Sequence, residues 1–403
     1  MELELRAITE EELAPFLRTF HAVFGGVVDD RDLARARRRL EPERCFVAID
    51  RSGEVVATAG AHSFTMALPG GGEVGAAGIT LVAVRADHRR RGVLTALLRR
   101  LLDQARERGE AVAALWASET PIYGRFGFGP AIPTVELTLD RAHADLAVHG
   151  PVDEVELVDT AAARTAFPVL RDEVLGVRAG LLRRPEAFWD DLLDPEAAPP
   201  PGAGPLQLAL LPGRGYAIYR LEPEWTAGAP TATVRVQELH ASDTPAAAAL
   251  WRFVTDVDLA STTVAGRRPV DDPVLAMLVD QGRARVAVDW ALQVRLLEPV
   301  PALTARRYAA EDTLHLDVVD ACVPERSARF ELAVAGGKAS CVRTERAADL
   351  QLDVRALSTV YLGGVRTTQL LAGGQAVERV PGAASRLDRL LATPLAPWHE
   401  FMF

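Results

Sequence analysis

The stretch VAVRADHRRRGVLTALLRRLL, residues 82–102, joins a short apolar run to three consecutive arginines and then to a leucine-rich segment. Apolar side chains recur there at intervals of three and four, which predicts a helix packed on one face. The residues on this face are Leu94, Leu97, Leu98, Leu101, Leu102 and Ala105. Gly109 stands where such a helix would end. The stretch therefore predicts a strand, a charged loop and a helix.

Further strands are predicted on both sides of this stretch. Residues 73–84 lead into the arginines, and residues 111–118 follow the helix as a second buried strand. A connection of this kind normally joins parallel strands. Upstream, residues 9–24 predict a first helix, and residues 44–50 and 54–68 predict two strands. The first part of the chain is therefore predicted to be α/β.

A second segment, residues 154–297, shows a weaker version of the same pattern of strands and helices. Helical patterns around 168–193 precede a hairpin predicted over 206–222. Residues 232–259 again run from strand into helix, here without arginines or glycines at the junction. The Pro/Gly-rich stretch 194–205 predicts a long surface loop rather than a linker.

The last segment begins at residue 298. Alternating strands are predicted over 314–320 and 328–344, followed by a helical segment over 349–364, which indicates a separate α+β module. A chain of 403 residues exceeds the usual length of one domain. We predict domains at residues 1–153, 154–297 and 298–403.

Composition narrows the classes of function. The chain has 45 basic and 55 acidic residues, a formal charge of −10, which argues against a general nucleic-acid binder and mildly favours cationic partners. No run approaches the roughly 18 apolar residues of a membrane span, and the N-terminus lacks the features of a signal peptide. Cys45, Cys322 and Cys341 are too scattered for a disulfide framework or a metal site, and Cys322 and Cys341 lie in strand-like runs. We expect buried thiols, no metal, no membrane or nucleic-acid partner, and a cytoplasmic location.

The arginines before the helix suggest a ligand. A helix N-terminus presents about four unpaired N–H groups and roughly half a positive charge, so it attracts phosphate. Gly92 permits close approach, and Arg89, Arg90 and Arg91 can add paired hydrogen bonds to phosphate oxygens. A pyrophosphate or a phosphorylated nucleotide tail fits this pattern. A solvated basic turn, or arginines paired with acidic residues of another subunit, fits the spacing equally well.

The same run resembles a known motif. RRRGV, at Arg89 to Val93, is similar to the Q/R-x-x-G-x-G/A pyrophosphate loop of the GCN5-related N-acetyltransferases (GNAT), which cradles acetyl-coenzyme A. Leu94 departs from the final Gly or Ala. The run HRRRGVL, together with ASETPIYGRFGFGPA at 117–131 and DLQLDVRALSTVYLGG at 349–364, resembles the enhanced intracellular survival (Eis) acetyltransferases, in which a bulky residue at that position is usual. The resemblance covers nearly the whole chain.

The resemblance implies an α/β (α+β) fold with two tandem acetyltransferase-like domains, the second without a cofactor loop, and then a sterol-carrier-protein-like domain. It also implies a cofactor site for acetyl-coenzyme A. The pantetheine arm would be held by the backbone of Val82, Ala83 and Val84, and the reacting sulfur would lie near Ser118 and Glu119. The pyrophosphate would be held by Arg90, Arg91, Gly92, Val93, Leu94 and Thr95.

Two catalytic groups follow from the same resemblance. Tyr123 is the implied acid, because a phenol with an ordinary pKa of about 10 holds its proton at neutral pH and can yield it to a departing thiolate. Alternatively, Tyr123 only packs in the core with Phe126 and Phe128. The implied base is the C-terminal carboxylate of Phe403.

The chain end supports such a role. It reads PWHEFMF, residues 397–403, and is so apolar that we expect it to dock rather than fray. A carboxylate with an ordinary pKa near 3.5 would act through water or by orienting the amine. His399 and Glu400 are alternative bases. Met402 stands where family members can carry an acidic residue, which leaves open whether the amine pocket has an acidic lining.

The implied function is acetyl transfer from acetyl-coenzyme A to primary amines of cationic acceptors, such as aminoglycosides, lysine side chains or polyamines. The implied assembly is a hexamer made of three dimers. Two alternatives remain. The chain could be a carrier whose C-terminal module binds an apolar or polyamine ligand, or a regulatory scaffold with a vestigial site.

Overall fold

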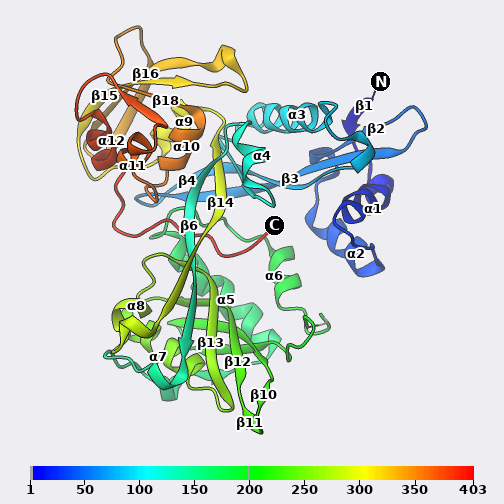
Figure 1. Cartoon of the computed structure of the whole chain (residues 1–403), viewed down its shortest axis with the longest axis vertical. Coiled ribbons are helices and arrows are strands. Elements are labelled where there is room, and N and C mark those ends of the chain that lie inside the picture. The colour runs from blue at the N-terminus through cyan, green and yellow to red at the C-terminus, as the bar shows by residue number, and fades with distance from the viewer. Residues whose placement is uncertain (1–2, 198) are drawn as a thin grey trace. The chain divides into compact units, whose positions relative to one another are not determined.

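The computed structural model describes residues 3–197 and 199–403, and most of its helices and strands are labelled in Figure 1. The chain divides into two compact units. The first unit comprises Met1–Ala131, Leu292–Thr393 and Phe401–Phe403, and the second comprises Ile132–Ala291 and Pro394–Glu400. No helix in the described part of the chain is long and apolar enough to cross a lipid bilayer.

The N-terminal part of the first unit is built on a sheet with neighbouring strands in the order β1-β2-β3-β4-β5. Their bounds are β1 (Glu4–Ala7), β2 (Cys45–Ile49), β3 (Val55–Leu68), β4 (Gly72–Val84) and β5 (Val112–Trp116). β4 and β5 are parallel, as predicted, and the other neighbours are antiparallel. Beyond β5 the first unit continues with Leu292–Leu296, the end of β14 (Arg285–Leu296). The predicted strands of this region are confirmed.

The crossover from β4 to β5 is the helix α3 (Val93–Glu107). Its predicted apolar face is confirmed at Leu97, Leu98, Leu101, Leu102 and Ala105, which are buried, whereas Leu94 is only partly buried. These leucines pack against strands rich in alanine, whose small side chains allow the helix to approach closely. A second cluster packs α1 (Leu13–Val23) against β2. The sequence analysis did not detect α2 (Asp30–Arg39), in which Ala36 is the one buried residue.

The C-terminal module of the first unit, residues 299–393, has a sheet with the order β17-β16-β15-β18-β19. Its strands are β15 (Asp312–Val319), β16 (Ala328–Ala335), β17 (Lys338–Arg343), β18 (Leu350–Asp353) and β19 (Ala376–Glu378). Its helices are α9 (Pro299–Ala305), α10 (Val354–Val360), α11 (Thr367–Ala372) and α12 (Ala383–Leu391). The predicted strands of this α+β module are confirmed.

Two details of the module correct the sequence analysis. The segment 349–364 was predicted to be helical, but it begins as β18, because Leu350 and Leu352 are buried on alternate positions. Only from Val354 is it a helix, with the Asp353 carboxylate accepting a hydrogen bond from the Ala356 N–H (2.7 Å). Cys322 does not lie on a strand, although it is buried; it follows β15 in a turn.

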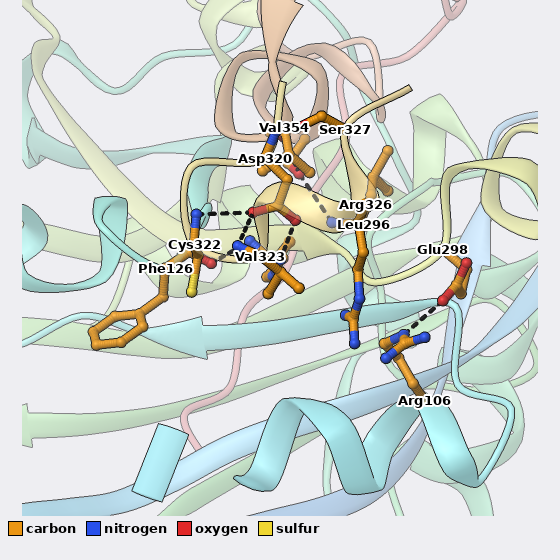
Figure 2. A network of polar contacts seen from close by, with 12 residues as sticks. Arg106, Phe126, Leu296, Glu298, Asp320, Cys322, Val323, Arg326, Ser327 and Val354 are labelled. Carbon is orange, nitrogen blue, oxygen red and sulfur yellow. Dashed lines mark hydrogen bonds and ion pairs between the residues drawn. The ribbon is translucent and has the colours of Figure 1, made fainter. Parts of the chain in front are cut away.

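A polar network joins this module to the N-terminal part of the first unit (Figure 2). The buried Asp320 carboxylate accepts hydrogen bonds from the N–H groups of Cys322 and Val323 (both 3.0 Å). It also forms an ion pair with Arg295 (2.6 Å). Arg106 of α3 pairs with Glu298 (2.5 Å) at the edge of the same region. Because Arg295 is fully buried, breaking this pair would strand a charge in the interior.

The second unit has a sheet with the order β6-β13-β12-β9-β8-β7. Its strands are β6 (Gly129–Asp140), β7 (Glu156–Leu157), β8 (Gln207–Leu211), β9 (Gly215–Glu222), β12 (Ala232–Ala241) and β13 (Ala260–Pro269), with a small hairpin of β10 (Trp225–Thr226) and β11 (Ala229–Pro230). Its helices are α5 (Thr160–Leu175), α6 (Glu186–Leu192), α7 (Thr244–Thr255) and α8 (Val274–Met277).

The connection β12–α7–β13 joins parallel strands, so the second unit repeats the arrangement β4–α3–β5 of the first. The predicted hairpin is β8–β9, and the predicted strand-to-helix run is β12–α7. The described residues of the predicted loop, 194–197 and 199–205, contain no helix or strand. The proposed boundaries after residues 153 and 297 remain predictions.

Candidate active site

The candidate site lies where β4 and β5 part. Within the described residues, their parallel pairing joins Ala76–Gly78 to Val112–Ala114 and goes no further, while β14 pairs along the other edge of β5. Along β3 the register shifts between Thr58 and Gly60, and Leu81 opposite has a positive φ of 53°. Such a bulge bends the strand and re-aims the residues that follow it. The opening therefore begins just before Val82–Val84.

A cavity of about 610 Å³ occupies this opening. Ten of the eleven cofactor-binding residues implied by the family resemblance line it, together with Tyr123. These ten are Val82, Ala83, Val84, Arg90, Gly92, Val93, Leu94, Thr95, Ser118 and Glu119. Arg91 is not among the lining residues, whereas Arg89 is, which the arginine run suggested as a phosphate contact but the resemblance did not include. Val23, Phe24, His88, Ile122 and Arg125 complete the lining and were not predicted.

The N-terminus of α3 faces this cavity with the features of an anion site. Its N-cap is Gly92, which has a left-handed φ of 79° that a side chain would strain. A Cβ added there would meet nothing within 4 Å, so the approach to the helix N-terminus is open. The first turn carries no acidic residue, and Arg89 and Arg90 flank it. The N–H groups and the two guanidinium groups together suit a pyrophosphate.

In the second unit, the N-terminus of the corresponding helix, α7, is capped by a carboxylate instead of being left open. The N-cap of α7 is Asp243, whose carboxylate accepts a hydrogen bond from the Ala246 N–H (2.8 Å) and pairs with Arg214 (2.8 Å). A carboxylate therefore already satisfies the helix N-terminus that a phosphate would need. The cavity beside α7 has only about 220 Å³. The N-terminus of α7 is therefore not open to a phosphate in the way that the N-terminus of α3 is.

Tyr123 lies on the short helix α4 (Thr120–Gly124), between the cavity and the core. The ring packs edge-on against Phe128 (6.2 Å between centroids) and belongs to the main core cluster. Packing and catalysis are therefore not exclusive alternatives for this residue. Burial, together with the negative charge of Glu119, raises the pKa of the phenol, so Tyr123 keeps its proton at neutral pH.

The loop after α4 is fixed by a buried cation that the sequence analysis missed. Arg295 donates a hydrogen bond to the Phe126 carbonyl and is held in turn by Asp320. Gly127 has a φ of 80°, and a Cβ there would collide with the Arg295 guanidinium. Arg295 sits within an apolar strand pattern, so nothing in its local sequence distinguished it. It aligns the segment that carries Tyr123.

The last three residues are docked in the first unit, as expected. A Phe403 carboxylate oxygen accepts a hydrogen bond from the Thr80 hydroxyl (3.0 Å), and the Phe401 carbonyl accepts one from the Trp116 indole (3.0 Å). Gly78 leaves room for this end, because a Cβ there would press on the Phe64 and Phe403 rings. Thr80 lies only two residues before Val82 on β4. The terminal carboxylate is therefore held on the strand whose continuation lines the cavity.

Aromatic side chains surround the docked end. The Phe403 ring lies edge-on to Phe64 (5.1 Å) and His62 (6.3 Å). Burial lowers the pKa of His62 to about 4, so its imidazole is neutral at neutral pH, with Nδ1 3.2 Å from the Arg39 carbonyl oxygen. His62, Phe64 and Thr80 were not predicted, because buried strand residues look alike whether they line a core or a site.

His399 and Glu400, the alternative bases, are buried in the second unit. Glu400 forms ion pairs with Arg171 (2.7 Å) and Arg184 (3.1 Å), which lower the pKa of its carboxylate despite burial. Glu400 is thus a poor proton acceptor. Its carboxylate, Glu238 and His240 could in principle surround a metal ion, but the two arginines already balance both carboxylates and oppose a further cation.

Comparisons with known proteins agree with this geometry. Residues 4–131 and 180–296 each match a model of an acetyltransferase (GNAT) domain, and residues 300–400 match a sterol carrier protein domain. An uncharacterized N-acetyltransferase of Streptomyces avermitilis is 39% identical, with 99% of each chain covered. The N-acetyltransferase Eis of Mycobacterium bovis is 32% identical over the full length of both chains. The crystal structure of Eis1 from Mycobacterium abscessus is 30% identical, with a TM-score of 0.88 over 99% of this chain and 100% of that one.

The fold is thus two GNAT domains followed by a sterol-carrier-protein-like domain, and the protein is an N-acetyltransferase. The chain belongs to the Eis family of N-acetyltransferases.

The position of the arginines yields a first prediction. Arg90→Ala should weaken acetyl-coenzyme A binding about tenfold or more, because a charge-assisted phosphate contact contributes roughly 1.5–3 kcal/mol. Arg91→Ala should have a smaller effect, because Arg91 does not line the cavity. Titration calorimetry of the two variants measures the difference. Equal affinities in wild type and Arg90→Ala would contradict the assignment of the pyrophosphate site.

Proposed function

We propose that this protein transfers the acetyl group of acetyl-coenzyme A to a primary amine of a cationic acceptor, with aminoglycoside-like compounds, lysine side chains and polyamines as the candidate classes. The observation that carries the proposal is the cavity between β4 and β5. It combines an uncapped helix N-terminus, two arginines and the phenol of Tyr123 in one opening. Such a set suits an acyl donor with a phosphorylated tail and a thiolate leaving group.

The transfer needs one carbon–nitrogen bond to form and one carbon–sulfur bond to break. In our proposal, the β4 backbone at Val84 donates its N–H toward the thioester carbonyl and stabilises the oxyanion that forms when the amine attacks. Tyr123 then protonates the departing thiolate. Its raised pKa suits this role, because the phenol is fully protonated at neutral pH while a thiolate is basic enough to accept the proton.

The amine proton is assigned to the terminal carboxylate of Phe403, acting through water or by orienting the acceptor. The hydrogen bond from Thr80 to that carboxylate supports this assignment, because it holds the group on β4 close to the start of the cavity. The Phe64 ring packs edge-on against the Phe403 ring (5.1 Å) and helps to hold this end in place. Glu400 is committed to its ion pairs, which leaves the terminal carboxylate as the stronger candidate.

The proposal also covers the cellular location of the protein and its oligomeric state. We place the protein in the cytoplasm, and the three free, buried cysteines are consistent with a reducing compartment. We also propose a hexamer made of three dimers, as the family resemblance implies. Val286, Val288 and Trp290, which alternate along β14 and are all exposed, are candidates for an interface between subunits.

The decisive experiment is mass spectrometry of an amine panel incubated with acetyl-coenzyme A and the untagged protein. We expect a mass increase of one acetyl group on cationic primary amines, and none on secondary or tertiary amines of similar size. The panel should contain an aminoglycoside, a polyamine and a lysine peptide, so that the result also identifies the class of acceptor.

Protein with acetyl-coenzyme A withheld is the control. Binding of acetyl-coenzyme A by calorimetry without acetylation of any amine would contradict the proposal and favour a scaffold with a vestigial site.

Replacing Tyr123 by phenylalanine separates acid catalysis from packing. The ring and its contact with Phe128 remain, so cofactor affinity and thermal stability should stay near wild type. Turnover should fall by about 10²–10⁴-fold, because the thiolate must then leave without a proton. Steady-state kinetics with saturating acetyl-coenzyme A measures this loss. Wild-type turnover in the variant would show that Tyr123 packs in the core and does not act as the acid.

A short C-terminal extension tests the terminal carboxylate. It deletes no side chain, yet it converts the charged terminus into a neutral peptide bond and forces extra atoms against Thr80 and Gly78. We expect turnover to fall by about a hundredfold, the loss typical of a small misplacement of a catalytic group. Phe403→Leu, which keeps the carboxylate, is the matched control and should be much milder. Full activity of the extended protein would exclude a catalytic role of the chain end.

A further inference from the structure

The segment Pro394–Glu400 belongs to the second unit, although it follows the C-terminal module in sequence. It lies at the opening between β12 and β13. These strands pair in parallel from Ala232–Val236 to Ala260–Ala265, and then they part. β12 continues along β9 up to Ala241, whereas the end of β13 pairs with β6. This is the same divergence that forms the cofactor cavity of the first unit.

Trp398 enters this opening. Its indole lines the small cavity beside α7, lies 4.9 Å from the His240 ring and is 3% exposed. The indole N–H donates to the Arg267 carbonyl (2.6 Å), and the Trp398 backbone N–H donates to Ala179 (2.9 Å). The Arg268 guanidinium lies over the indole at 4.9 Å. The place where a GNAT domain would hold its cofactor is therefore occupied by the chain's own C-terminal segment.

Glu400 anchors the end of the segment by charge. Its carboxylate is 2% exposed and pairs with Arg171 and Arg184. Arg184 is shared with Glu238 (2.5 Å), so two carboxylates face two arginines in the interior. A buried ion pair is sensitive to register, because moving one partner leaves an uncompensated charge. Apolar contacts alone would allow the segment to shift along its length by a residue, whereas the ion pairs of Glu400 do not.

We propose that the vestigial cofactor opening of the second unit is a socket for the C-terminal segment, in which Trp398 and Glu400 act as positioning residues for the terminal carboxylate. This inference rests on the proposed function. Only three residues follow Glu400, so a shift of the segment at Glu400 would carry the terminal carboxylate away from Thr80. A slip of one residue would move the carboxylate by about 3.5 Å, well beyond the roughly 1 Å at which catalysis suffers.

The test uses the untagged full-length protein carrying Glu400→Gln. The change removes the charge and keeps the side-chain size, so the end of the chain should lose its fixed register. We expect kcat to fall by at least about tenfold, with the affinity for acetyl-coenzyme A unchanged, because that ligand binds in the first unit. Tyr216→Phe is the matched control. It removes the hydrogen bond from Tyr216 to Glu238 in the same network but leaves the Glu400 pairs intact, and it should keep wild-type kcat.

A second readout does not depend on activity. Carboxypeptidase should release Phe403 from the Glu400→Gln variant at least about tenfold faster than from wild type or Tyr216→Phe, as followed by mass spectrometry. Should Glu400→Gln fail to fold, Trp398→Phe takes its place. It keeps an aromatic side chain but shrinks the indole to a phenyl ring and removes the N–H that donates to Arg267, so it should shift both readouts in the same direction by a smaller factor.

The inference is overturned if the folded variant keeps wild-type kcat, whether or not trimming is faster, or if kcat falls without faster trimming. A wild-type protein that acetylates no amine would count against the proposed function instead. The trimming assay would then still report whether the socket holds the chain end.

Discussion

The divergence of two parallel strands is the constraint on which this molecule depends. β4 and β5 share three residue pairs and then separate, and β4 bulges at Leu81 just beyond the last pair. The opening exposes the end of one strand and the N-terminus of α3 to the same space. Because α3 is held by a row of buried leucines, the position of its N-terminus is set by the core and not by the loop that precedes it.

The second unit contains the same divergence with different chemistry at the helix N-terminus. Gly92 leaves the N–H groups of α3 open, whereas Asp243 caps α7 with its own carboxylate. The residue at the N-cap thus decides whether the helix N-terminus is open to an anion, as with Gly92, or closed by its own side chain, as with Asp243. In the second unit, the indole of Trp398 lines the small cavity beside α7.

The C-terminal module contributes to the site through buried charge. Asp320 holds Arg295, and Arg295 holds the Phe126 carbonyl in the loop after Tyr123. The module is therefore part of the support for the candidate acid, whether or not it binds a ligand of its own. Such buried pairs contribute little net stability, but they allow a single arrangement of the loop.

The sequence by itself determined the strand–loop–helix unit around residues 82–102, the leucine face of α3 and the motif that indicates the family, because these depend on local periodicity and on neighbouring residues. It also pointed to an apolar chain end that would dock. Only the tertiary structure decided that Arg89 rather than Arg91 lines the cavity, that Thr80 holds the terminal carboxylate, and that Glu400 lies between two arginines. These contacts join residues far apart in the chain. A buried strand residue such as Thr80 or Arg295 carries no local signal of its partner, since the partner is chosen by how the strands diverge and where the chain end is held.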